Sequence, residues 1–192
     1  MKIQVIEGSV RSGRLGARVA QWAMAEAAKI EGLEVELVRL ADFPLPLYAE
    51  DYIPVVEHTY TDPMAQAWSA KIAGADGYIV VSAEYNHSIP GALKNALDYL
   101  YNEVTAKPVG IVTYSNGIIG GARAGQHLVQ VLGHLQMVAL PLQVAVGRAD
   151  KLINEAGELQ VDGPDKAMAG LCGQLVSYGA ALKPLQPQPA AA

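Results

Sequence analysis

The chain has 192 residues, of which 51% are hydrophobic and 17% are charged. This length and composition predict a globular protein with a sizeable core and exclude an intrinsically disordered one. The net charge of −5 and the lack of any Lys/Arg cluster exclude a nucleic-acid partner and an anionic membrane partner. We expect one domain over residues 1–183 and a disordered tail over residues 184–192, which are rich in Pro and Ala.

The single cysteine, Cys172, excludes a disulfide within the chain and indicates a reducing compartment. The first residues lack the long apolar core of a signal peptide, and no apolar run reaches the ~20 residues that a membrane span requires. We therefore expect a cytoplasmic protein. The four histidines show no metal-ligand spacing, and Cys172 falls among apolar helix positions, so no metal site is predicted.

Predicted strands and helices alternate along the chain. In chain order they are a strand over residues 2–7, a helix over 14–30, a strand over 34–40, a helix over 63–73, a strand over 77–82, a helix over 90–102, a strand over 108–114, a helix over 124–135, a strand over 138–146 interrupted by Pro141, and a helix over 164–182. This alternation predicts an α/β fold in which helices cover both faces of a parallel sheet. We expect the strand order 2-1-3-4-5.

The loop after the first strand, residues 8–16, has the sequence GSVRSGRLG. Its glycines permit tight turns, and the backbone N–H groups and dipole of the following helix attract an anion. Arg11 and Arg14 add positive charge, and Ser9 and Ser12 add hydroxyl donors. Two interpretations stay open for this first loop: a cradle for a phosphate monoester, or a turn whose arginines are solvated.

Two further loops follow the third and fourth strands, over residues 83–91 and 115–123. In the second loop, turn chemistry explains Asn86 and Ser88 but does not explain a Glu84–Tyr85 pair. Backbone N–H groups there would hydrogen-bond the rim of a planar heterocycle, with Tyr85 packed on it. In the strand order 2-1-3-4-5 all three loops meet at the edge of the sheet where ligands bind.

Three motifs resemble the NADPH-dependent FMN reductase family, which includes flavin, quinone, azo and chromate reductases. They are Gly8-Ser9-Val10-Arg11, the run EYNHSIPGALKN from Glu84 to Asn95, and Gly120-Gly121-Ala122-Arg123. The resemblance covers about residues 1–183 and implies a flavodoxin-like three-layer fold that binds FMN. Many relatives carry Ser and Asn in place of Arg14 and Gly16, and Pro in place of Ala83.

The resemblance also implies where the cofactor is held. The family's first loop grips the FMN phosphate, which here falls to Ser9, Arg11, Arg14, Leu15 and Gly16. The second loop contacts the isoalloxazine ring, here through Glu84, Tyr85 and Asn86. The third loop lies beside the ring, here with Ser115 and Gly117.

By resemblance, the chain is an oxidoreductase in which NAD(P)H delivers hydride to flavin N5, and no protein side chain acts as catalyst. The electrons then pass to a small-molecule acceptor: a quinone, a free flavin, an azo compound or a metal oxyanion. NADPH and NADH both stay open as co-substrate. Two alternatives bind FMN without turning over pyridine nucleotide: a flavodoxin-type electron carrier, which Arg11 disfavours, and a redox-sensing module.

We expect a homodimer or homotetramer, because Tyr99, Leu100, Tyr101 and Leu132 exceed the apolar surface that one sheet face requires. Residues 41–62 form a long Pro- and Tyr-rich connection, and its Tyr-rich stretch over residues 48–60 is either a packed surface loop or a wall of the substrate pocket. The roles of Arg14 and Arg123 stay open.

Overall fold

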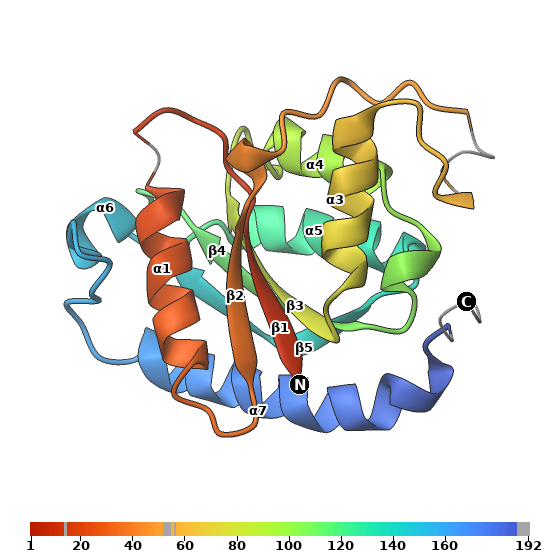
Figure 1. Cartoon of the computed structure of the whole chain (residues 1–192). Helices are drawn as coiled ribbons and strands as arrows, with labels where there is room; N and C mark the ends of the chain where they lie inside the picture. Colours follow the sequence, from red (N-terminus) through yellow and green to blue (C-terminus); the bar gives the residue numbers. More distant parts are fainter. Residues whose placement is uncertain (14, 52–54, 56, 188–192) are drawn as a thin grey trace.

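The computed structural model describes residues 1–13, 15–51, 55 and 57–187, and Figure 1 shows a sheet between two layers of helices. The five strands are paired in the order β2-β1-β3-β4-β5, and every pair is parallel. They are β1 (Lys2–Glu7), β2 (Glu34–Arg39), β3 (Gly77–Ala83), β4 (Pro108–Tyr114) and β5 (Val138–Val146). The predicted architecture and strand order are confirmed.

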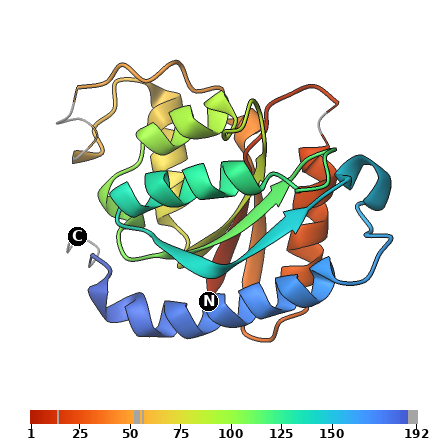
Figure 2. The same ribbon diagram turned by 180° about the vertical axis from the view of Figure 1, so that it is seen from behind.

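Helices cover both faces of the sheet, as Figure 1 and the reverse view in Figure 2 show. The α-helices are α1 (Gly16–Ala27), α3 (Pro63–Ala73), α4 (Gly91–Asp98), α5 (Ala122–His134), α6 (Ala149–Leu152) and α7 (Pro164–Leu182). Short 3₁₀ helices span Leu40–Asp42, Asn102–Val104 and Lys183–Leu185. Among the described residues, no helix has the length and apolar character needed to cross a bilayer.

The core has two layers because the central strands alternate their side chains between the two faces. Ile79 and Val81 of β3 pack with α1 and α7, whereas Tyr78 and Val80 of the same strand pack with α3, α4 and α5. All seven residues of β3 and all seven of β4 are buried. Burial of each large apolar side chain contributes about 1.5–3 kcal/mol, so these two strands fix the centre of the fold.

Helix boundaries follow the caps. The Asp62 carboxylate accepts hydrogen bonds from Met64 N at 2.7 Å and Ala65 N at 3.2 Å, which confirms the predicted start of α3. The prediction that α4 continues to Asn102 is wrong. It ends at Asp98, and the Tyr101 N–H donates to Glu103 Oε2 at 2.7 Å instead of to a helical carbonyl.

The expected interruption of the last strand at Pro141 is a bulge. Val109 pairs with Ala139 but Ile111 pairs with Gln143, so β5 contains two extra residues opposite β4. β5 is an edge strand, so one of its sides has no neighbouring strand. A proline, which lacks a backbone N–H, is tolerated in such a strand.

The apolar residues on which we based the expected oligomer belong to the core. Tyr99, Leu100 and Leu132 are 1%, 2% and 0% exposed, and Tyr101 is half-buried. Tyr60 donates a hydrogen bond from its hydroxyl to the Tyr99 carbonyl. This basis for an oligomer is therefore wrong, because Tyr99, Leu100 and Leu132 are buried in the chain's own core, with Tyr48 and Tyr60 packed on Tyr99.

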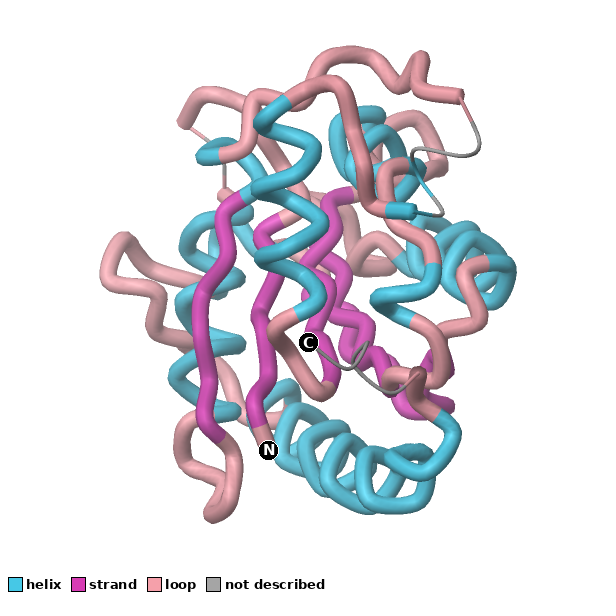
Figure 3. The backbone as a smooth tube through the Cα atoms, turned by 45° about the vertical axis from the view of Figure 1, so that its right-hand side comes forward, coloured by secondary structure: helices cyan, strands magenta, loops and turns pink. Residues whose placement is uncertain are grey.

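The carboxyl ends of the parallel strands meet at one edge of the sheet, the upper edge in Figure 1 and Figure 3. The loops after β1, β3 and β4 therefore lie together, as predicted. Residues 188–192, part of the tail for which we predicted disorder, lie outside the described residues.

At the opposite end of the sheet, Lys107 is a buried cation. Its Nζ donates to the carbonyl of Ala73, the last residue of α3, at 2.9 Å and to the Tyr78 hydroxyl at 3.3 Å. Burial lowers the pKa of Lys107 to about 8. The lysine donates to the last carbonyl of α3, where a cation is favourable. Burial of its charge, however, destabilises the folded state when the lysine is protonated.

We expect this penalty to appear as pH-dependent stability. Between pH ~8 and the ordinary lysine pKa of about 10.4, the unfolded chain binds more protons than the folded one, so rising pH stabilises the folded state. Urea unfolding of the wild type and Lys107→Met at pH 7, 8.5 and 10 should show the wild type gaining about 1–3 kcal/mol relative to the variant. Lys166→Met, on the exposed face of α7, serves as the control. Parallel pH profiles for wild type and Lys107→Met would contradict the assignment.

Candidate functional site

The three predicted loops line one cleft at the carboxyl edge of the sheet. Its volume is about 430 Å³, within the range of small-molecule sites. The lining residues are Arg11, Ser12, Gly13, Leu15, Arg18, Ala83, Glu84, Tyr85, Tyr114, Ser115, Asn116 and Asp150.

The predicted site residues divide into three groups. Those that line the cleft are Arg11, Leu15, Glu84, Tyr85 and Ser115. Those that belong to the same loops without lining the cleft are Ser9, Gly16, Asn86 and Gly117. Arg14 lies outside the described residues.

The amino-terminal end of α1 opens onto the cleft without a side-chain cap. Leu15 is its N-cap residue, no side chain of the described residues accepts from its first N–H groups, and no acidic residue lies in its first turn. By contrast, α3 is capped by the Asp62 carboxylate. Free N–H groups at a helix start attract an anion, and Arg11 in the same cleft adds positive charge.

Tyr114 is a site residue that the sequence interpretation missed. It is the last residue of β4, is buried and lines the cleft. Its hydroxyl reaches the start of α1: a methyl group on Gly16 would collide with the hydroxyl oxygen and approach Tyr114 Cζ to 3.2 Å. The absence of a side chain at Gly16 therefore places a phenol hydroxyl beside the helix start. The position of Tyr114 at the carboxyl end of a central strand was the available signal.

A pair of hydroxyls joins the first loop to the second. Ser9 Oγ and the Tyr85 hydroxyl are 2.8 Å apart, and Ser9 Oγ also accepts from Arg11 N at 3.4 Å. Ser9 is buried, and its hydroxyl holds the first loop through these two hydrogen bonds. Tyr85 thus spans from the second loop to the first.

The second loop contains a tight two-residue turn. Tyr85 N donates to Ser88 O at 2.8 Å, and Ser88 N donates to Tyr85 O at 3.0 Å. The residues between them, Asn86 and His87, have φ values of +51° and +66°. Positive φ at both central positions is the pattern of a type I′ turn, which favours Asn first and Gly second. His87 in the second position is strained, and both residues are exposed.

Backbone hydrogen bonds anchor the third loop. The Gly117 carbonyl accepts from Arg148 N at 3.0 Å and from Ser115 Oγ at 3.3 Å. Gly120 and Gly121 adopt φ values of +63° and +83°, and a Cβ on either would press into the backbone of β4 or β5. These two glycines let the chain turn sharply from β4 into α5.

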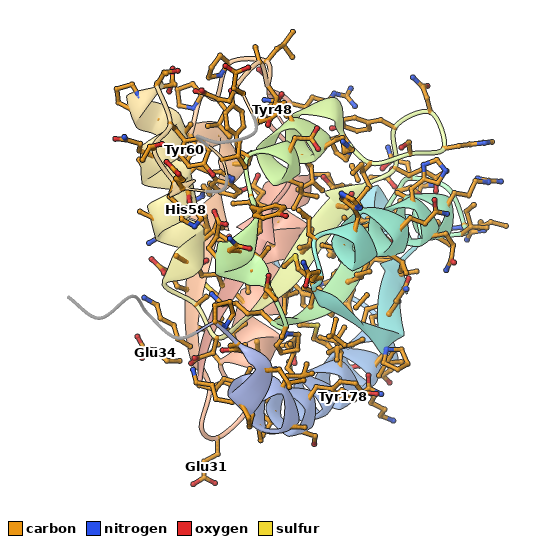
Figure 4. The ribbon with its side chains drawn as sticks, turned by 90° about the vertical axis from the view of Figure 1, so that its right-hand side faces the viewer. Glu31, Glu34, Tyr48, His58, Tyr60 and Tyr178 are labelled. Atoms are coloured by element: carbon orange, nitrogen blue, oxygen red, sulfur yellow. The ribbon has the colours of Figure 1, made fainter. Side chains whose placement is uncertain are left out.

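The Tyr-rich connection packs on α4 and also lines a groove. Asn95 of α4 accepts from Tyr48 N at 2.8 Å, and the Tyr48 and Tyr99 rings meet edge to face at 5.1 Å. Figure 4 shows Tyr48, Tyr60 and His58 gathered beside α3 and α4. An apolar groove of about 460 Å³ runs between this connection and Val10 of the first loop. The groove is lined by residues 41–47 of the connection, and no described residue of the stretch over 48–60 lines it or the cleft. For that stretch the structure favours the packed surface loop.

Metal-ligating and thiol groups outside the cleft were the other candidates for chemistry. Within the described ranges, no three His, Cys, Asp or Glu side chains are grouped to hold a metal ion. Cys172 is buried, as predicted, and burial raises the pKa of its thiol to about 11. A thiol with so high a pKa is unreactive near neutral pH.

Comparison with known proteins identifies the family. The model of the NADPH-dependent FMN reductase family matches residues 1–151. This chain belongs to that family. Its members use FMN and NAD(P)H, so the chain is a member of an oxidoreductase family and the resemblance seen in its motifs is confirmed.

Individual FMN reductase relatives support the same assignment. An NAD(P)H-dependent FMN reductase of Schizosaccharomyces pombe is 41% identical over 76% of this chain and 72% of the relative. A quinone reductase of Escherichia coli K12 is 34% identical over 93% of this chain and 94% of the relative. The flavoenzyme NAD(P)H:(acceptor) oxidoreductase from Paracoccus denitrificans has the same fold, with a TM-score of 0.70 at 24% identity over 95% of this chain and 97% of that one.

The cleft of this FMN reductase family member fits its cofactor chemically. A phosphate monoester is a dianion, and the start of α1 offers free N–H groups beside Arg11 and the hydroxyls of Ser12 and Tyr114. The cleft is also lined by Ala83, Glu84 and Tyr85 of the second loop, and an aromatic side chain such as Tyr85 packs well against a planar ring. Donors for a phosphate and an aromatic side chain for a ring match the chemistry of FMN.

Proposed function

We propose that this chain is an NAD(P)H-dependent reductase that holds FMN in the cleft and reduces a quinone. The uncapped start of α1 beside Arg11 carries the proposal, because it is the strongest anion site in the cleft. When bound, FMN accepts hydride from NAD(P)H and passes the electrons to the second substrate.

The chain's own residues bind and orient the cofactor. Arg11, Leu15 and the N–H groups of the first turn of α1 hold the phosphate end. Glu84, Tyr85 and Asn86 face the ring, and Ser115 and Gly117 flank it. Charge-assisted contacts are stronger than neutral ones, so affinity depends mainly on the phosphate end.

We propose a quinone as the acceptor because relatives that align with 93% and 82% of this chain are named quinone reductases. A free flavin, an azo compound or a metal oxyanion is the alternative acceptor. The arginines of the first loop favour a reductase over a flavodoxin-type carrier, whose phosphate loop relies on hydroxyls and backbone. A single cysteine and these relatives support a cytoplasmic location.

The purified protein should show the visible absorption of bound FMN, and NADPH or NADH under anaerobic conditions should bleach it. Adding p-benzoquinone should then restore the colour as the quinone is reduced. Stopped-flow absorption compares the two pyridine nucleotides and the acceptors. Bound FMN that neither nucleotide bleaches would instead support the electron-carrier or sensor alternative.

Arg11→Ala should weaken FMN binding about ten- to a hundredfold, because it removes a charged contact worth about 1.5–3 kcal/mol. Riboflavin, which lacks the phosphate, should bind both proteins alike. Flavin fluorescence titration of the apoprotein measures both affinities.

Tyr114→Phe is the matched test of the phenol hydroxyl, and its loss of FMN affinity should be smaller than that of Arg11→Ala. Tyr178→Phe, on α7 and away from the cleft, should leave both affinities unchanged. Equal loss of FMN and riboflavin binding in Arg11→Ala would place the phosphate elsewhere.

We also propose a homodimer or homotetramer, now for a different reason. Val10, Leu47, Ile118 and Ile119 are 49%, 86%, 75% and 42% exposed, and all lie in loops at the carboxyl edge of the sheet. Sedimentation at micromolar concentration should show an oligomer that Leu47→Glu weakens and Val161→Glu, in the loop before α7, does not. A wild-type monomer would contradict this proposal.

A further inference from the structure

The second loop is held from α5 by an ion pair at its start. Arg123 Nη1 donates to Glu84 Oε1 at 3.0 Å, and the Arg123 backbone N–H donates to Glu84 Oε2 at 3.2 Å. The Glu84 side chain is 10% exposed. Its carboxylate also sits at the amino-terminal end of α5, whose own N-cap residue, Gly121, has no side chain. The charge of Glu84 is thus stabilised by both a guanidinium and a helix terminus.

The same helix holds the other end of the loop. His127 Nδ1 and Ser88 Oγ are 3.0 Å apart. Arg123 and His127 are four residues apart, so they lie on one face of α5 in successive turns. Glu84 and Ser88 are also four residues apart, and the two central residues of the turn, Asn86 and His87, lie between them in the chain.

The segment between the two contacts is the strained part of the loop. Asn86 and His87 keep positive φ values although neither is glycine. Strained backbone persists only where its surroundings hold it. The two contacts from α5 supply that restraint, and the Ser9–Tyr85 hydroxyl pair supplies it from the opposite side.

We propose that Arg123 and His127 are positioning residues that hold the Tyr85–Ser88 turn against the flavin ring. The inference rests on the proposed placement of that ring beside the second loop. The guanidinium of Arg123 acts through Glu84 and the imidazole of His127 acts through Ser88, so neither residue touches the cofactor. Holding the turn in one conformation fixes the wall that meets the ring before the cofactor arrives.

Amide hydrogen exchange of the apoprotein tests the restraint without any cofactor. Arg123→Gln and His127→Ala should each raise the exchange rates of the Tyr85 and Ser88 amides about fivefold, because each removes one side-chain hydrogen-bond contact. His127→Asn, whose amide occupies the place of Nδ1, should restore slow exchange. Gln130→Ala on the exposed face of α5 and Lys166→Gln on α7 are the controls. Unchanged exchange in both test variants would overturn the proposal.

The FMN-loaded protein then tests positioning. The visible spectrum of bound FMN should shift in Arg123→Gln and His127→Ala, while the ³¹P resonance of its phosphate stays in place. Anaerobic reduction by NADPH at saturating FMN should slow about three- to tenfold. His127→Ala keeps the test valid if Arg123→Gln fails to fold. Faster exchange with an unchanged flavin spectrum would overturn the positioning role. A wild type that binds no FMN would overturn the proposed function while leaving the exchange result standing.

Discussion

Burial of β3 and β4 on both faces is the constraint on which the rest of this structure depends. Every residue of these strands is covered, so helices must lie on both sides and each connection must cross over the sheet. Crossovers between parallel strands place all carboxyl ends at one edge. The loops after β1, β3 and β4 therefore meet whatever their own sequences are, and the cleft is a consequence of strand direction.

The first and second loops contribute to the cleft in opposite ways. The first loop leaves the start of α1 uncapped and adds Arg11, so positive potential is available to an incoming anion. The second loop has its polar groups engaged already: Glu84 with Arg123, Ser88 with His127, and Tyr85 with Ser9. The first loop attracts an anion, and the second loop forms a wall of the cleft whose shape is fixed by these contacts.

This division suits a reductase in which the cofactor supplies the reactive chemistry. In the proposed function no titratable side chain is needed at the reacting atoms, so the chain's own residues bind and orient the cofactor. We propose that the Tyr85–Ser88 turn and its supports on α5 serve orientation. Residues 41–47 form a wall of an apolar groove that also includes Val10 of the first loop. The NADPH-dependent FMN reductase family, to which the chain belongs, includes members named for different acceptors. Different side chains in such walls provide a physical basis for accepting different electron acceptors.

The sequence by itself determined the layer architecture, the strand order and the family. Apolar periodicity, the Asp62–Pro63 helix start and the motifs at residues 8–11, 84–95 and 120–123 are local signals, and local signals survive without knowledge of the fold. It did not reveal the end of α4, because the apolar pattern continues through Leu100 and Tyr101, although the Tyr101 N–H donates to the Glu103 side chain. Nor did it reveal the core position of Tyr99, because its cover comes from Tyr48 and Tyr60, some 40–50 residues earlier in the chain. Only the tertiary structure showed that Tyr114 reaches Gly16, that Ser9 bonds to Tyr85 and that Arg123 holds Glu84. These contacts join residues far apart in sequence, and packing of the strands and helices alone brings them within bonding distance.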